Sequence, residues 1–218
     1  MGTQDGVDLL LDSIQYLNRV RGQNDVLFVL IGGGSEFACL KTQITELGLN
    51  GCVKLTGGLY GNDLKAYLAT ADVAVAPDPS NAFNDKLTMI KIFEYMACGL
   101  PIVLFDLPEG RNSAGGAALY ARGNDPHDFA EKIAQLLDSI LLRDQLGRNG
   151  RKRFVEKLNW RIENQTFLKA YRVALARNVP AALGSSRGQP PAPNGFHRLE
   201  RTISFGERRK IEQKSELR

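Results

Sequence analysis

The residues best suited to chemistry lie in a short stretch, 84–101, where a polar turn leads into an apolar helix. Thr88 is a good candidate for the N-cap of that helix. The amides of Met89 and Ile90 would then be free to bind an anion such as a diphosphate, with the helix dipole adding its attraction. Lys86 stands just before this end and could meet the same anion. The pattern indicates an anion site.

Glu94 lies on the same expected helix, among residues that are mostly core types. Its carboxylate must face solvent or accept hydrogen bonds, because burying it unpaired is too costly. The hydroxyls of a ribose are suitable donors. A surface ion pair with Lys91, three residues earlier, is the structural alternative. The spacing by itself leaves both interpretations open.

Two glycine-rich turns follow expected strands. Gly33 and Gly34 precede a helix, where backbone amides could approach an anion. Gly57, Gly58 and Leu59 follow the next strand, and the glycines there could let a flat base lie against the backbone. For both turns a plain tight turn is an equal alternative. Neither turn contains a dinucleotide or P-loop fingerprint.

The loop after the expected strand 101–105, residues 106–113, is polar and long for a connection between a strand and a helix. Its charges could meet substrate or simply solvent. The chain contains no D-x-D motif, so the commonest acidic metal clamp for a nucleotide sugar is absent from the sequence.

These residues need strands and helices to position them, and the sequence alternates accordingly. Apolar blocks bounded by turn residues predict five strands: 26–31, 52–56, 72–77, 101–105 and 117–120. Helical periodicity predicts a helix over 7–20, before the first strand, and further helices between the strands. One of these covers 62–71, and we expect Asn62 or Asp63 to cap it. Strands separated by helices indicate an α/β fold, a single Rossmann-like domain with a mainly parallel sheet flanked by helices. In such a sheet, ligands bind beyond the carboxyl ends of the strands, which is where the glycine turns and Glu94 fall.

From Pro126 the pattern is wholly helical, with Asp125 as the expected cap. We expect one domain over residues 1–178, followed by a disordered or loosely helical basic tail over 179–218. Residues 181–218 carry 8 of the 28 Lys and Arg but only 4 of the 24 Asp and Glu. The remaining 180 residues are therefore balanced, so the basic character belongs to the tail. That tail could touch an anionic membrane surface, and no nucleic-acid partner is expected.

Composition limits the classes of function. Three widely spaced cysteines predict neither disulfides nor a zinc site, and we expect Cys39, Cys52 and Cys98 to be buried small hydrophobic residues. The presence of only two histidines argues against a Ser-His-Asp triad and against a His-rich metal site, so no metal and no cofactor are expected. No membrane span or signal-peptide pattern is found, and we expect a cytoplasmic location.

The segments VLIGGGSE, VKLTGGL and FEYMACGLPIV, in this order, resemble the C-terminal, donor-binding domain of family 4 retaining glycosyltransferases of the GT-B fold. The resemblance implies that Glu94 binds the nucleotide ribose, that Leu87, Thr88 and Met89 hold the diphosphate through their amides, and that Gly57 to Leu59 bind the base. It implies a UDP- or GDP-sugar as substrate.

The chain departs from the family at two places. Lys86 stands where the family carries the first glutamate of E-x7-E, as in a bacterial subgroup with NDK-x-TM. We take Lys86 as the candidate catalytic residue, in contact with the donor sugar or the phosphate. The acceptor-binding N-terminal domain has no counterpart, so we expect a donor-binding half that is inactive by itself and that needs an acceptor-domain partner chain. Two alternatives remain: a non-catalytic interaction domain derived from this fold, and, less favoured, a GT-B epimerase.

Overall fold

Five short parallel strands form the centre of the structure. The computed structural model describes residues 1–23 and 25–177, so the tail expected over 179–218 lies outside the described residues. Each strand lies inside an apolar block of the sequence. The strands are β1 (Phe28–Ile31), β2 (Val53–Gly57), β3 (Ala74–Ala76), β4 (Ile102–Phe105) and β5 (Ala118–Ala121).

The strands form two ladders rather than one. β1 pairs with β2, and β3–β4–β5 form a second sheet in that order, every pair being parallel. The single sheet that the sequence predicts is therefore split into two ladders, and the break lies between the strand pair β1–β2 and the strand group β3–β4–β5. β3 has only three residues, because Pro77 and Pro79 remove amide donors directly after it, and it pairs only with β4 among the described strands.

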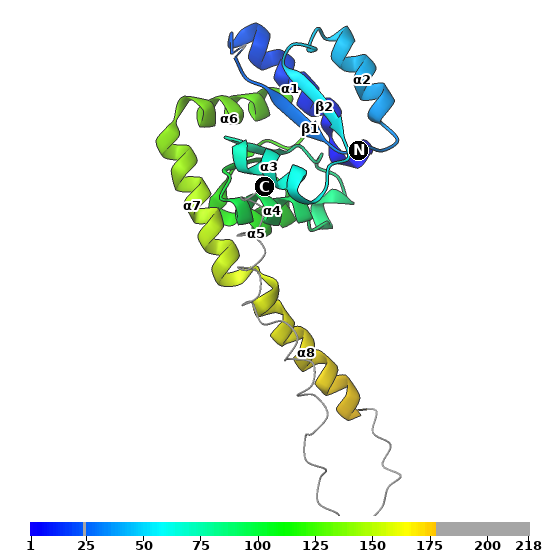
Figure 1. Cartoon of the computed structure of the whole chain (residues 1–218), viewed down its shortest axis with the longest axis vertical. Coiled ribbons are helices and arrows are strands. Elements are labelled where there is room, and N and C mark those ends of the chain that lie inside the picture. Colours follow the sequence, from blue (N-terminus) through cyan, green and yellow to red (C-terminus); the bar gives the residue numbers. More distant parts are fainter. Residues whose placement is uncertain (24, 178–218) are drawn as a thin grey trace, which may run out of the picture. The chain divides into compact units, whose positions relative to one another are not determined.

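Helices connect and cover the strands (Figure 1). The α-helices are α1 (Val7–Val20), α2 (Phe37–Glu46), α3 (Gly61–Thr70), α4 (Ile90–Cys98), α5 (Pro108–Ala114), α6 (Pro126–Asp138), α7 (Ile140–Lys157) and α8 (Trp160–Arg177). Three 3-10 turns are also present: η1 (Thr3–Asp5), η2 (Asn84–Lys86) and η3 (Gly115–Ala117). Met1–Leu168 form one compact unit, and the residues from Lys169 onward belong to a second.

The core of the first unit lies where α1 and α6 pack against each other and α6 covers β4 and β5. All four residues of β4 are buried, as expected for a central parallel strand. Phe105 on β4 packs against Phe129 on α6, with ring centroids 4.7 Å apart. The predicted period of α1 is confirmed, since it buries Leu10 and Ile14 on one face.

Glycines allow α7 to approach α4 closely. A Cβ added at Gly147 would lie 2.2 Å from the carbonyl oxygen of Gly99, and one at Gly150 would lie 3.2 Å from Cγ of Met96. Gly99 ends α4 in the left-handed conformation, with φ of 73°, which favours glycine. Arg151 on α7 donates to the carbonyl of Ala97 in the last turn of α4. The end of α4 is therefore fixed by α7.

Three local predictions are wrong. The loop 106–113 contains a helix, α5, whose last carbonyls at Asn112 and Ser113 accept hydrogen bonds from Arg153 on α7. α3 begins after Tyr60 without a side-chain cap, so neither Asn62 nor Asp63 caps it.

The third concerns the cysteines. Cys52 is buried as expected, but Cys39 and Cys98 are exposed, because they lie on the outer faces of α2 and α4.

Candidate nucleotide-binding site

The structure brings the two glycine turns together at the carboxyl ends of β1 and β2. Gly32 donates from its amide to the carbonyl of Gly57, with N···O 2.8 Å, and Gly57 adopts φ of 73°. The amides of Gly33 and Gly34 have no acceptor among the described residues. Gly57 is the last residue of β2, and Gly58 and Leu59 follow it directly. Both glycine turns that the sequence indicates therefore lie at the carboxyl ends of β1 and β2.

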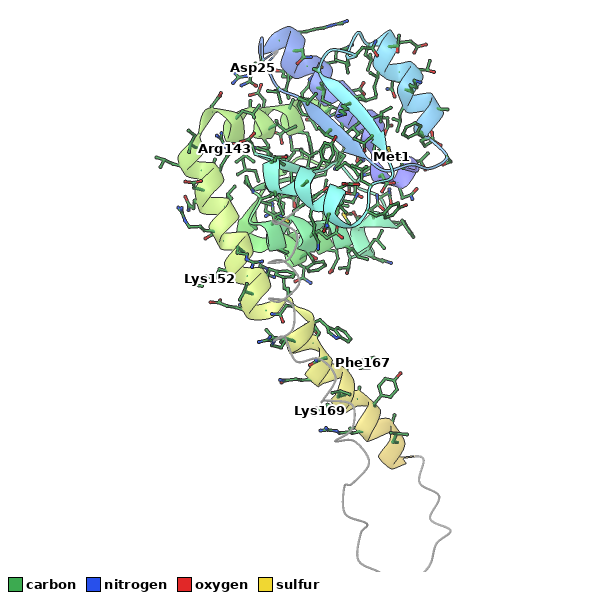
Figure 2. All side chains as sticks on the ribbon, viewed as in Figure 1. Met1, Asp25, Arg143, Lys152, Phe167 and Lys169 are labelled. Carbon is green, nitrogen blue, oxygen red and sulfur yellow. The ribbon has the colours of Figure 1, made fainter. Side chains whose placement is uncertain are left out.

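Met1 lies against the first of these turns (Figure 2). Its amino group donates to the carbonyl of Gly33, and its carbonyl accepts from the amide of Glu36 at 3.2 Å. A Cβ at Gly34, where φ is 145°, would lie 2.4 Å from the nitrogen of Met1. Close backbone packing therefore requires glycine at position 34 whether or not a ligand binds there.

α4 begins without a side-chain cap. Its N-cap residue is Met89, not Thr88 as predicted, because Thr88 donates its hydroxyl hydrogen to Oε1 of Glu109 on α5, with O···O 3.1 Å. The backbone amides of Met89 and Ile90 have no acceptor among the described residues. The N-terminus of α4 therefore presents free donors at the end of β3, which is the arrangement that binds anions.

Glu94 is exposed on α4, one turn beyond these amides. The predicted alternative, an ion pair with Lys91, is wrong: the ammonium of Lys91 lies 2.8 Å from Oδ1 of Asp78 and 3.5 Å from Oδ1 of Asp5. Within the described part of the chain, the carboxylate of Glu94 has no hydrogen bond or ion pair. It is therefore available to accept from hydroxyl groups.

Lys86 ends η2, and Leu87 connects η2 to the residues before α4. The side chain of Lys86 is exposed, and its ammonium has no carboxylate partner in the described ranges. Leu87 is also exposed, so this segment forms an open rim beside the N-terminus of α4.

Sequence reasoning missed the residues that shape this rim. Asn84 is fully buried and donates from Nδ2 to the carbonyl oxygens of Gln4 and Pro79, at 3.0 and 2.9 Å. Asp78 is 3% exposed, and burial raises the pKa of its carboxyl, an effect that Lys91 opposes. The signal available for Asp78 was its place between two prolines at a strand end.

β3 and α4 are also joined by Tyr95, whose hydroxyl donates to the carbonyl of Val75 at 3.4 Å. Burial is the main cause of the raised pKa of this phenol, and the carboxylates of Asp78 and Glu94 add to it. Tyr95 is thus a neutral structural contact at neutral pH.

A hollow of about 430 Å³ lies elsewhere, between α1 and α6, and is lined by Tyr16 and His127, whose rings stack with centroids 4.5 Å apart. It is formed by helix side chains rather than by strand ends, so we do not assign the nucleotide to it. Among the described residues, no cluster of His, Cys, Asp and Glu could hold a metal ion.

The sequence profile described as "Glycosyl transferases group 1" matches residues 1–139. The chain belongs to the group 1 glycosyltransferases. The parallel strands flanked by helices are those of GT-B glycosyltransferase structures. None of the helices in the described part of this glycosyltransferase chain has the length and apolar character needed to cross a membrane.

Two relatives illustrate the similarity. The chain is 31% identical over 175 residues to MMP alpha-(1->4)-mannosyltransferase of Mycolicibacterium hassiacum. This match covers 79% of this chain and 41% of the relative. It is 38% identical over 144 residues to the amylovoran biosynthesis glycosyltransferase AmsK of Erwinia amylovora, covering 63% and 32%. The chain thus spans less than half of the length of these relatives.

Solved structures share the fold. HepE from Anabaena in complex with UDP-glucose superposes with a TM-score of 0.64 at 19% identity, covering 79% of this chain and 46% of that one. TarM from S. aureus, solved with UDP, superposes with a TM-score of 0.68 at 21% identity. The superposition covers 78% of this chain and 34% of TarM. At these identities the likeness establishes the fold.

Proposed function

We propose that this chain is the donor-binding, C-terminal half of a retaining glycosyltransferase and that it holds a UDP- or GDP-sugar at the carboxyl ends of its strands. The observation that carries the proposal is the pairing, on α4, of an uncapped N-terminus with the unpaired carboxylate of Glu94. Free amides suit a diphosphate, and an accepting carboxylate suits ribose hydroxyls.

The remaining residues complete this assignment. Leu87, Thr88 and Met89 would surround the diphosphate, and Lys86 would add a positive charge to the phosphate or contact the sugar. Gly57, Gly58 and Leu59 would lie along the base, while Gly33 and Gly34 would bring free amides to the same edge. The match of Lys86 to an NDK-x-TM subgroup belongs to the same proposal. The UDP and UDP-glucose bound by neighbours of the same fold support a nucleotide-sugar ligand.

Calorimetric titration of the chain with UDP and with GDP tests the proposal. We expect saturable binding of at least one nucleotide. Glu94→Ala should weaken it by about 1–3 kcal/mol, the cost of losing hydrogen bonds to a charged acceptor. Glu46→Ala is the matched control, because Glu46 is also an exposed helical glutamate but ends α2, a helix that carries none of the proposed site residues. No binding, or equal effects of the two variants, would remove the proposal.

A second candidate, a non-catalytic interaction domain, is favoured by exposed apolar side chains at the same edge. Tyr60, Phe83 and Ile90 are 83%, 64% and 72% exposed, and they lie at the N-termini of α3, η2 and α4, around the proposed nucleotide site. Exposed apolar groups of this size favour contact with another polypeptide. A partner that still binds Glu94→Ala in the presence of excess UDP and GDP would favour this reading.

A further inference from the structure

Lys91 lies in the first turn of α4 with three carboxylates in reach. Its ammonium contacts Asp78 at 2.8 Å and Asp5 at 3.5 Å. Glu94 follows three residues later, and side chains spaced in this way on a helix are close enough to pair. Three carboxylates could therefore compete for this one cation, and the structure pairs it with Asp78 and Asp5 and not with Glu94.

Burial decides this competition. The side chain of Asp78 is 4% exposed, and its Oδ2 has no hydrogen-bond partner in the part of the chain that is described. An ionised carboxylate in such a place depends on its one cation, because attraction is stronger where water is excluded. Asp5 is held in position by the amide of Gly2, which donates to its Oδ2 at 2.9 Å. Glu94 is exposed, so an ion pair with it would be weaker.

We propose that Asp78 is a positioning residue for the nucleotide site. By holding Lys91, assisted by Asp5, it keeps the carboxylate of Glu94 unpaired and able to accept hydrogen bonds from ribose hydroxyls. Asp78 acts through Lys91 and touches no nucleotide. This inference rests on the proposed function, and it adds a residue to which neither the sequence nor the family resemblance assigns a role.

Nucleotide titrations of three variants test it, with UDP or GDP as the probe, whichever the wild type binds. In Asp78→Asn, Lys91 becomes free to pair with Glu94, and binding should weaken about twofold, the factor that corresponds to a helix-surface ion pair. Asp5→Asn/Asp78→Asn should weaken it further. Asp78→Asn/Lys91→Met removes the competing cation and should restore wild-type affinity.

The salt dependence of nucleotide binding, and its measurement in a Glu94→Ala background, give two further readouts. Raising the salt to about 1 M should abolish the Asp78→Asn defect, because the Debye length then falls to about 3 Å. In a Glu94→Ala background, Asp78→Asn should have no additional effect, so a double-mutant cycle would show coupling between Asp78 and Glu94. A purely structural role for Asp78 predicts neither rescue by Lys91→Met nor this dependence on salt.

The outcomes separate this inference from the function on which it rests. If the wild type binds neither UDP nor GDP, the proposed function fails. If the wild type binds in a manner sensitive to Glu94→Ala, but Asp78→Asn/Lys91→Met binds no better than Asp78→Asn, the positioning role is overturned. Should Asp78→Asn not fold, Asp5→Asn against Asp5→Asn/Lys91→Met gives the same comparison with a smaller expected loss.

Discussion

Asp125 closes the N-terminus of α6, whereas α4 begins with no side-chain cap. The carboxylate of Asp125 accepts hydrogen bonds from the amides of His127 and Asp128, both at 3.0 Å. These bonds lower the pKa of Asp125, chiefly through the amide of Asp128, while the nearby Arg122 contributes less. The cap on α6 serves stability, whereas we propose that the uncapped end of α4 binds a ligand.

The two helix starts predict opposite effects of substitution. Asp125→Ala should cost about 1 kcal/mol of unfolding free energy near pH 7, the usual cost of a lost cap. Thr88→Val, which removes a hydroxyl that caps nothing, should change stability by less than about 0.5 kcal/mol. Urea denaturation of the three proteins measures both. Equal losses would mean that Thr88 caps α4 in solution.

The lowered pKa of Asp125 also fixes the direction of a pH effect. Because its pKa in the folded chain lies below the ordinary 3.8, the stabilisation is present above pH 3.8 and is lost as the pH falls through the folded value. The difference in unfolding free energy between wild type and Asp125→Ala should therefore shrink below pH 3.8. A difference that stays constant down to pH 2 would contradict the carboxylate cap.

Residue roles were predictable where they depend on neighbours along the chain. The cap at Asp125 is a local feature, and the sequence predicts it. The partner of Lys91 was missed because Asp78 is 13 residues away and becomes a neighbour only when α4 returns along β3. The hydroxyl of Thr88 was misassigned because Glu109, on another helix, is a competing acceptor.

At the scale of elements, α7 determines how α4 and α5 end. It places Arg151 at the carbonyl of Ala97 and Arg153 at those of Asn112 and Ser113, and it approaches α4 through Gly147. Strands and long helices were predictable from their apolar periods. α5 was not, because its sequence, PEGRNSA, contains weak helix formers, and its geometry depends on contacts from α7.

Close packing of α7 on α4 makes Gly147 sensitive to the smallest side chain. Gly147→Ala places Cβ 2.2 Å from the backbone oxygen of Gly99, so the helices must separate, and the strain should exceed the roughly 1 kcal/mol that alanine adds to helix propensity. We expect a net destabilisation of about 1–3 kcal/mol, the usual cost of overpacking. Gly51→Ala, where an added Cβ meets nothing within 4 Å, is the control and should be near neutral. Thermal unfolding distinguishes them, and equal midpoints would show that the helices are not in this contact.

At the scale of the whole molecule, the proposed nucleotide site is an open, solvent-exposed surface. The chain spans 41% of the length of its mannosyltransferase relative, and Glu94 and Ile90 are both exposed at the strand ends. The family resemblance predicted the GT-B fold. The division of the strands into two ladders could not be predicted from apolar patterns, because these patterns do not specify which strand edges meet.

An open, solvent-exposed site should bind a nucleotide sugar without cleaving it. Glycosyl transfer requires a reacting centre from which water is excluded, and the exposed residues of the proposed site do not exclude it. We therefore expect the chain to bind UDP-glucose or GDP-mannose saturably while releasing UDP or GDP no faster than Glu94→Ala does. Chromatographic quantification of free nucleotide during incubation measures this. Release that depends on Glu94 and exceeds the buffer rate would show that the chain acts on the donor by itself. Turnover that appears only when an acceptor-domain chain is added would place the other part of the reacting centre on that partner.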